Sequence, residues 1–241
     1  MSHSRSIRGV VGLKVLVVLT NSEYYDRAHK YASGLWLAEA TDFVDVVEQA
    51  GLEVDFMSPK GGVVPIDPMS LHWLFTNRST LNRYQSVQFQ DRALTYSLNP
   101  AQVKSRDYVA IYYTGGHGGL ADFKDNPALK QVAEEIHQRG GYLCSVCHGL
   151  AGLLNLQNSD GSYLLQGRRA TGFTTREEKL MGKAQAVPYH VEQIARERGC
   201  NFRRGIPFTP FAFKDGQIIT GQNPMSSHYV ARLLVRSLSK K

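Results

Sequence analysis

The segment that most constrains the fold is YLCSVCHGLAGLL, residues 142–154. Its apolar run stops at Cys147, His148 and Gly149, and a helical pattern of small and apolar residues follows at once. This pattern predicts a strand, a sharp turn and a helix, with a thiol at the corner. A side chain at such a turn stands above the sheet and faces the positive end of the next helix, which favours the thiolate. Cys147 is therefore predicted to attack a carbonyl carbon, with His148 as proton acceptor.

Aliphatic and β-branched runs alternate with helical patterns up to this turn. Strands are predicted at residues 14–20, 52–57 and 107–113, and helices at 35–50 and 127–138. Continuous apolar strands separated by helices are typical of a parallel sheet that is covered on both faces. We therefore expect a flavodoxin-like, doubly wound α/β fold with a nucleophile elbow. The functional groups of such folds gather at the carboxyl ends of the strands.

A length of 241 residues suits one large α/β domain, and a single domain is predicted over residues 1–241. Residues 1–13 are predicted to be a flexible leader rather than a signal peptide. Residues 63–106 are polar and weakly periodic, and they are predicted to be an insertion with one or two helices. Beyond the elbow we expect a short strand at 169–173, two short helices, a hairpin over 211–220 and a terminal helix.

Composition excludes several classes of function. The net charge is +7, but the 28 basic residues are scattered and no nucleic-acid motif accompanies them, so no nucleic-acid partner is predicted. No apolar run reaches the length of a membrane span, and no membrane association is predicted. Three cysteines are too few for a disulfide framework and favour a reducing, cytoplasmic location. Cys144 lies three positions before Cys147 in the same strand, so its side chain points to the other face and belongs in the core.

A glycine-rich loop, TGGHGG at residues 114–119, ends the predicted strand beside the elbow. Glycine lets a backbone amide approach a ligand closely, so the amides of Gly116 and His148 are predicted to stabilise an oxyanion. His117 fits either a solvated loop position or a wall of the substrate pocket. Glu39 lies at the edge of the apolar face of the first predicted helix, where a carboxylate is usually solvated.

No spacing typical of a metal site occurs in the sequence. Four possible ligands are far apart along the chain and could meet only through the fold: His72, His117, Asp122 and His190. We therefore predict no metal site.

Six stretches resemble one known family and occur in its order. They are SGLWLAEA (33–40), SPKGGVVPIDPMS (58–70), TGGHGG (114–119), VCHG (146–149), TGFTTREE (171–178) and TGQNPMSS (220–227). They are similar to the deglycase/PfpI superfamily of class I glutamine amidotransferase-like proteins. The resemblance is closer to the heat-shock chaperone and glyoxalase III branch of that superfamily.

The resemblance implies roles for particular residues. Cys147 matches the nucleophile, and Glu39 matches a protonated glutamate that hydrogen-bonds the catalytic thiolate and acts as general acid and base. Glu178 matches the acidic partner of His148, although the adjacent Glu177 leaves the register open by one residue. Gly116 and the backbone of His148 match the oxyanion donors, and His117 belongs to the same loop.

The activity implied by the resemblance is that of a glutathione-independent glyoxalase, a lyase that converts methylglyoxal to D-lactate. Cys147 would add to the aldehyde of this α-oxoaldehyde to form a hemithioacetal, and Glu39 would move a proton between its two carbons. No cofactor is required. The family also suggests a homodimer.

Three other functions stay open on sequence grounds. Cys147, His148 and Glu178 could form the triad of an amidase or peptidase, and the same thiol could act on glycated proteins as a deglycase. The third is a holding chaperone for misfolded proteins, or a redox sensor in which Cys147 is oxidised to a sulfinate.

Overall fold

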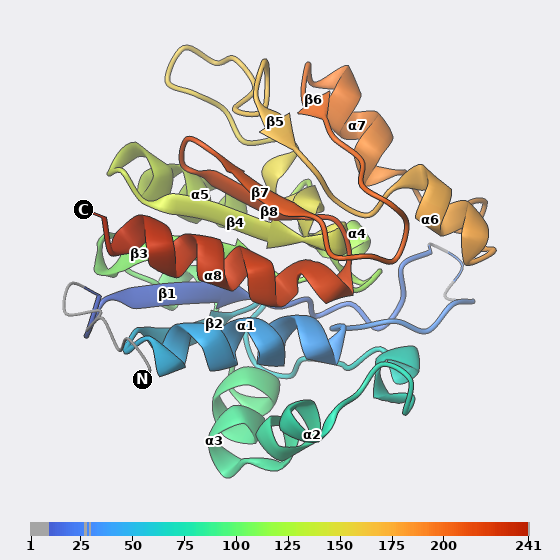
Figure 1. Ribbon diagram of the computed structural model, residues 1–241, viewed down its shortest axis with the longest axis horizontal. Helices are drawn as coiled ribbons and strands as arrows, with labels where there is room; N and C mark the ends of the chain where they lie inside the picture. The colour runs from blue at the N-terminus through green and yellow to red at the C-terminus, as the bar shows by residue number, and fades with distance from the viewer. Residues whose placement is uncertain (1–9, 27, 29, 241) are drawn as a thin grey trace, which may run out of the picture.

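A six-stranded sheet runs through the centre of the molecule, with its strands in the order β2-β1-β3-β4-β8-β7 (Figure 1). The computed structural model describes residues 10–26, 28 and 30–240. The strands are β1 (Lys14–Val18), β2 (Glu53–Met57), β3 (Tyr108–Tyr113), β4 (Tyr142–Val146), β7 (Ala212–Asp215) and β8 (Ile218–Gly221). All neighbours are parallel except β7 and β8, which form the predicted hairpin at one edge. This order confirms the predicted flavodoxin-like α/β fold.

Helices cover both faces of the sheet, as predicted. The long helices are α1 (Leu37–Gln49), α5 (Pro127–Gln138) and α8 (Ser227–Leu238). Side chains alternate along β1, so Val15 and Val17 pack in the core shared with α1 and α8, whereas Leu16 and Val18 pack in the core shared with α5. A strand with both faces buried needs a continuous apolar sequence, which explains why β1 could be located from the sequence.

Short helical segments occupy the stretch predicted as an insertion, residues 63–106. They are η1 (Pro68–Leu71), α2 (Arg78–Gln85), α3 (Val87–Phe89), η2 (Gln90–Thr95), η3 (Pro100–Gln102) and η4 (Ser105–Asp107). The α2 segment lies beside α1, and α3 lies next to α2 (Figure 1). Arg83 of α2 is paired with Asp45 and Glu48 of α1 at 2.6 Å each. The leader predicted for residues 1–13 falls mostly outside the described residues.

The chain after β4 departs from prediction in three places. Its elements are η5 (Cys147–Leu153), β5 (Arg169–Ala170), α6 (Thr175–Leu180), α7 (Val191–Glu197), β6 (Asn201–Phe202) and η6 (Pro224–Ser226). The segment after the elbow is a tight 3-10 helix, and a β carbon on Gly149 or Gly152 would collide with Tyr113. The helix predicted from Pro188 begins three residues later. The strand predicted over 169–173 has only two residues, and it pairs with β6 in a separate parallel sheet.

No helix in the described part of the chain is both long enough and apolar enough to span a bilayer.

Candidate functional site

The predicted nucleophile stands at the corner between β4 and η5. Cys147 has a φ of 56°, a left-handed backbone conformation that residues other than glycine rarely adopt. A β carbon on Gly115 would collide with the Glu39 carboxyl group and with Cys147, and one on Gly149 would collide with the carbonyl oxygen of Tyr113. The turn therefore depends on small residues at these two positions. It leaves Cys147 only 4% exposed.

The thiol is the first member of a chain of polar contacts that runs through a histidine to a glutamate. The Nδ1 atom of His148 lies 3.3 Å from Cys147 Sγ, and its Nε2 atom lies 2.5 Å from Glu178 Oε1. Burial would raise the pKa of Glu178, but the charge of His148 and the hydrogen bonds of both His148 and His117 outweigh burial and hold this pKa well below its usual range. The ionised Glu178 can stabilise the imidazolium that His148 becomes when it accepts the thiol proton.

A second histidine shares the same carboxylate. His117 lies in the glycine-rich loop before α4 (Gly119–Asp122), with Nε2 at 3.3 Å from Glu178 Oε2 and its ring centroid 4.0 Å from that of His148. Burial and the charge of His148 lower the pKa of His117 to about 3, so its ring is neutral at neutral pH. Its Nδ1 atom has no hydrogen-bond partner among the described residues. Of the two positions considered for His117, the structure places it in the pocket wall.

A buried carboxyl group completes the surroundings of the thiol. Glu39, in the first turn of α1, is fully buried, and its Oε2 atom accepts a hydrogen bond of 2.5 Å from the Gly115 amide. Burial raises the pKa of Glu39 to about 8, against the opposing effects of the Cys147 side chain and the Gly115 amide. Glu39 therefore carries a proton at neutral pH beside Cys147, and its Oε1 atom has no hydrogen-bond partner among the described residues. A carboxylate on a helix is usually solvated, but the carboxyl group of Glu39 is buried.

The protonation state of the thiol corrects one expectation. The elbow sequence predicts a resting thiolate, but burial and then the neighbouring Glu39 raise the pKa of the Cys147 thiol well above its usual value. The backbone amide of His148 acts in the opposite direction and is outweighed. The helix that follows is a 3-10 segment of seven residues, too short to supply the field expected of a full helix. The thiol is therefore protonated at rest, and His148 is the group placed to remove its proton.

Two adjacent glutamates have different partners, which resolves the register left open by the sequence. Glu178 contacts the histidines, whereas Glu177 forms hydrogen bonds within its own helix and to a distant loop. Its Oε2 atom accepts bonds from the amide and hydroxyl of Thr174, and Oε1 accepts from the Phe208 amide and the Asn223 side chain. Among the described residues, Glu177 therefore forms no hydrogen bond with the thiol or with His148.

A cavity of about 320 Å³ opens above Cys147 at the carboxyl ends of the strands. Besides the thiol and the two histidines, it is lined by one glycine, four aromatic side chains, two methionines and a proline: Gly116, Trp36, Phe75, Phe173, Phe208, Met181, Met225 and Pro224. The rings of Trp36 and Phe75 are 5.1 Å apart, and Phe173 lies 4.6 Å from His148. The reactive groups therefore lie at one end of a largely apolar pocket.

The sequence did not identify the aromatic wall of this cavity. Phe75 comes from the stretch between β2 and β3, and Phe208 comes from the loop that follows β6. Each lies in a short apolar stretch, LHWLF (71–75) or IPFTPF (206–211), and neither stretch has a motif or a period that indicates function.

All three cysteines are free and buried. Cys144 packs in the core between the sheet and α1, as predicted. It therefore contributes to packing rather than to a redox pair with Cys147.

One group of possible metal ligands occurs among the described residues: His117, His148 and Glu178, with ligand atoms within 4.8 Å of one another. Three residues considered on sequence grounds do not join it: His72, Asp122 and His190. Glu178 bridges the two imidazole rings through their Nε2 atoms, whereas Nδ1 of His117 has no partner among the described residues.

A nucleophile elbow on a parallel sheet, with a cysteine at the corner and a histidine next to it, defines a class of cysteine-dependent α/β proteins. Residues 31–237 match the DJ-1/PfpI family, and the chain belongs to this family.

Individual relatives resemble nearly the whole chain. A glutathione-independent glyoxalase from Saccharomyces cerevisiae is 31% identical over 235 residues, which cover 93% of this chain and 96% of that protein. The crystal structure of glyoxalase III from Candida albicans has a TM-score of 0.85 and 27% identity, and the alignment covers 93% of this chain and 97% of that one. The rapid encystment protein of Francisella tularensis has a TM-score of 0.88 and 28% identity, with 93% and 98% covered.

Proposed function

We propose that this protein is a glutathione-independent glyoxalase that converts α-oxoaldehydes such as methylglyoxal to α-hydroxy acids, here D-lactate. The observation that carries the proposal is the pair of groups beside Cys147: a histidine 3.3 Å from the sulfur that can accept its proton, and a buried Glu39 that holds a proton at neutral pH. The glyoxalases among the relatives, aligned over almost their full length, support the same activity.

The first step is addition of the thiol to the aldehyde. As Cys147 Sγ bonds to the aldehyde carbon, its proton passes to Nδ1 of His148, and the carbonyl electron pair moves onto oxygen. Glu39 then gives its proton to this oxygen, which completes a hemithioacetal. The backbone amides of Gly116 and His148 are proposed to stabilise the oxygen while it is charged. Ionised Glu178 balances the imidazolium.

The second step moves hydrogen between the two carbons. Glu39, now a carboxylate, removes the proton from the former aldehyde carbon, and His148 returns its proton to the ketone oxygen, which gives an enediol. Glu39 delivers the proton to the second carbon, while the hydroxyl proton on the first carbon passes to His148. The product is a thioester of the hydroxy acid.

Water completes the reaction. Its hydroxyl adds to the thioester carbon, its proton returns to Glu39, and the departing Cys147 sulfur recovers a proton from His148. One water enters and one hydroxy acid leaves, and each protein group ends in its starting state. The balance needs neither glutathione nor another cofactor.

Lactate formation from methylglyoxal without glutathione tests the proposal. Native protein should produce D-lactate, and Cys147→Ala should reduce the rate to that of buffer, because no covalent intermediate can form. Cys144→Ala is the matched control, since this thiol lies in the core and away from the cavity. Equal rates for the native and Cys147→Ala proteins would rule out the mechanism.

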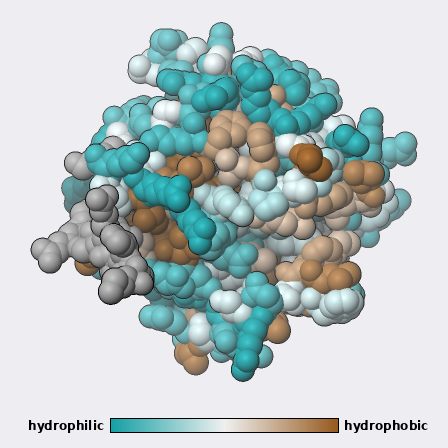
Figure 2. Space-filling view, viewed as in Figure 1, coloured by the Kyte–Doolittle hydropathy of each residue, from teal (hydrophilic) through white to brown (hydrophobic). Residues whose placement is uncertain are grey.

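A second candidate function is a holding chaperone for misfolded proteins, favoured by exposed apolar side chains near the cavity. Trp73 is 75% exposed and Leu74 is 62% exposed, and both follow η1 on the segment that leads to Phe75. Figure 2 shows hydrophobic patches interrupting the hydrophilic surface on the face it presents. Suppression of client aggregation should survive Cys147→Ala but fall in Trp73→Ser/Leu74→Ser. Loss of suppression in Cys147→Ala alone would exclude this function.

We also propose a cytoplasmic location and a homodimer. Three free, buried thiols support a reducing compartment. The dimer is supported by the family resemblance alone, and the mass of the protein in solution tests it.

A further inference from the structure

Two strained residues line the same cavity. Cys147 and Phe208, with φ of 56° and 55°, are the non-glycine residues of the described chain that have positive φ. The strain at Cys147 comes with the nucleophile elbow, but Phe208 takes no part in the chemistry described above. Backbone strain of this kind persists only where surrounding contacts enforce it, and it is concentrated at functional sites. The contacts that hold Phe208 in this conformation therefore also fix one wall of the cavity.

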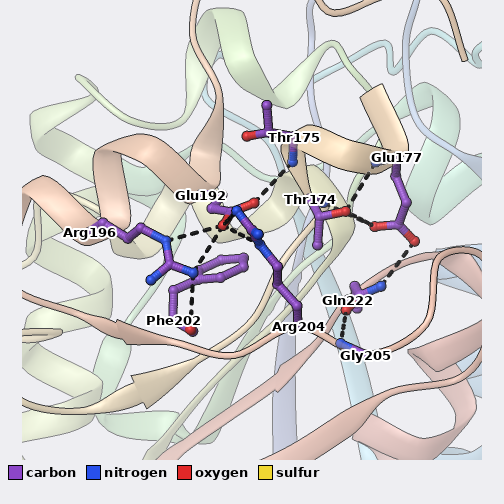
Figure 3. A network of polar contacts seen from close by, with 9 residues as sticks. All are labelled: Thr174, Thr175, Glu177, Glu192, Arg196, Phe202, Arg204, Gly205 and Gln222. Carbon is purple, nitrogen blue, oxygen red and sulfur yellow. Dashed lines mark hydrogen bonds and ion pairs between the residues drawn. The ribbon is translucent and has the colours of Figure 1, made fainter. Parts of the chain in front are cut away.

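Glu177 is the group that holds Phe208. Its fully buried carboxylate accepts the Phe208 amide at 2.9 Å, and the same oxygen accepts the Gln222 side chain at 3.1 Å. Gln222 in turn accepts a hydrogen bond from the amide of Gly205 at 2.6 Å (Figure 3). The loop that contains Phe208 is therefore attached at two points, Gly205 and Phe208. The second carboxylate oxygen is bound by Thr174 at the start of α6.

The same carboxylate also holds the other side of the wall. Asn223 donates to Glu177 Oε1 at 2.9 Å and to the carbonyl of Thr209 at 2.8 Å. Asn223 is followed directly by Pro224 and Met225, which line the cavity. One buried carboxylate thus fixes two segments that lie 31 and 46 positions from it in sequence, and the apolar side chains of both line the space above Cys147.

The size and character of this space exceed what methylglyoxal needs. An apolar cavity of about 150 Å³ can hold a benzene ring, and the cavity here measures about 320 Å³. The substituent of methylglyoxal is a single methyl group. A larger apolar substituent would bury more surface against the aromatic and thioether side chains, with the dicarbonyl group placed at Cys147.

We propose that Glu177 is a positioning residue that builds an apolar subsite through Phe208 and Asn223, and that the preferred substrates are α-oxoaldehydes with a branched alkyl or aryl substituent. This inference rests on the proposed glyoxalase activity. It adds the substrate class and the residue that sets it.

A series of substrates tests the preferred class. Formation of the corresponding hydroxy acid is measured for methylglyoxal, isobutylglyoxal and phenylglyoxal. Isobutylglyoxal is included because its carbonyl groups resemble those of methylglyoxal electronically, which separates binding from intrinsic reactivity. The value of kcat/KM should rise with the apolar substituent, by about tenfold or more from methylglyoxal to isobutylglyoxal. A flat or falling series with methylglyoxal still turned over would overturn this inference and leave the proposed function intact. No turnover of any member would overturn both.

Variants test the positioning role. Glu177→Gln keeps the shape of the side chain, but its NH2 group replaces one of the two accepting oxygens. This group then faces a backbone N–H donor, that of Thr174 or that of Phe208, and the hydrogen bond there is lost. The KM for isobutylglyoxal should rise more than that for methylglyoxal, and the ratio of the two kcat/KM values should fall toward one. Phe208→Gly should give the same fall in ratio without loss of thermal stability, because glycine tolerates this φ.

Glu192→Gln is the matched control. Glu192 is also a buried carboxylate near α6, but it binds Arg196, Arg204 and the Thr175 amide rather than the cavity wall (Figure 3). The Glu192→Gln variant should lower the unfolding temperature and preserve the ratio of the kcat/KM values for isobutylglyoxal and methylglyoxal. If Glu177→Gln also lowered only the unfolding temperature, or slowed both substrates equally, Glu177 would be a stabilising residue and the positioning role would be wrong.

Discussion

Glu39 and Glu178 are two buried carboxyl groups beside the same thiol and histidine, and they have opposite protonation states. Glu39 is 0% exposed, and burial raises its pKa to about 8, with smaller contributions from Asp42 and Asp67. Glu178 is 3% exposed, yet the two imidazole rings overcome the effect of burial and hold its pKa well below the usual range. The two groups are almost equally buried, so their neighbours decide which one is charged.

The difference separates two chemical tasks. A protonated Glu39 can give a proton to the substrate and take one back, whereas an ionised Glu178 can only balance the charge on a histidine. Pairs of titratable groups whose surroundings drive their pKa values apart are typical of acid–base catalysis. Glutamine at either position removes one task and leaves the size of the side chain unchanged.

The largest effect is expected at Glu39. Glu39→Gln cannot move a proton between the two substrate carbons, so kcat for methylglyoxal should fall toward the upper part of the range of about 10²–10⁴ for general acid–base groups. Alkylation of Cys147 by iodoacetamide should not slow, because His148 still accepts the thiol proton and the carboxyl group that raises the pKa of the thiol is gone. Lactate assays and alkylation kinetics on the same preparation measure the two effects.

Glu39→Gln also separates the proposed glyoxalase from an amidase. A triad of Cys147, His148 and Glu178 would not use Glu39, so hydrolysis of amide substrates by this variant at the native rate would favour the amidase. Glu192→Gln is again the control, since its carboxylate lies outside the cavity. Full glyoxalase activity in Glu39→Gln would contradict the proton transfers assigned to Glu39.

The second largest effect is on the pH dependence of stability. The folded pKa of Glu39 lies near 8 and its ordinary value is 4.5, so the folded state binds the extra proton between these limits. Stability from this group is therefore fully present below about pH 4.5 and is lost as the pH rises towards 8, by up to about 4 kcal/mol. Burial raises the pKa of Asp122 to about 7 and that of Asp42 to about 6, which gives losses of the same sign.

Comparison of native protein with Glu39→Gln isolates the contribution of Glu39. The free energy of unfolding, measured by denaturant titration from pH 5 to 8, should fall more steeply for the native protein than for the variant. Asp122 remains in both proteins and cancels in the difference, as does Asp42 apart from its repulsion of an ionised Glu39. Parallel curves would show that the carboxyl group of Glu39 is ionised in the folded protein at neutral pH.

The same comparison shows what the sequence could predict. The elbow and the strands β1, β3 and β4 could be located because each depends on neighbouring residues: an apolar run, then Cys147, His148 and Gly149 in order. The place of Glu39 beside the thiol could be predicted only from the family resemblance, because a single glutamate on a helix has no local signal of function. Its protonation state depends on burial by distant segments, and so does the raised pKa of Cys147, which the elbow motif alone predicted in the wrong direction.

The cavity wall lay beyond sequence reasoning for a similar physical reason. Glu177 and Glu178 are neighbours in a capping sequence, and only the packing of α6 decides which one faces His148. Phe208 reaches the cavity because Glu177 binds its amide, and that hydrogen bond spans 31 positions in sequence. Contacts of this kind are set by the tertiary fold, whereas periodicity reports only on local faces.

The smallest of the three effects is expected at Glu178, because it acts through His148 rather than on the substrate. Glutamine still accepts the Nε2 proton of His148 and holds the ring in place, but it cannot balance the imidazolium charge. Glu178→Gln should therefore lower kcat by about 10–100-fold, equivalent to about 1.4–2.7 kcal/mol. Unlike Glu39→Gln, it should slow alkylation of Cys147 by a similar factor, since both reactions need His148 to take the thiol proton. If Glu178→Gln slowed lactate formation and left alkylation at the native rate, Glu178 would act after thiol addition, and the division of tasks between the two glutamates would be wrong.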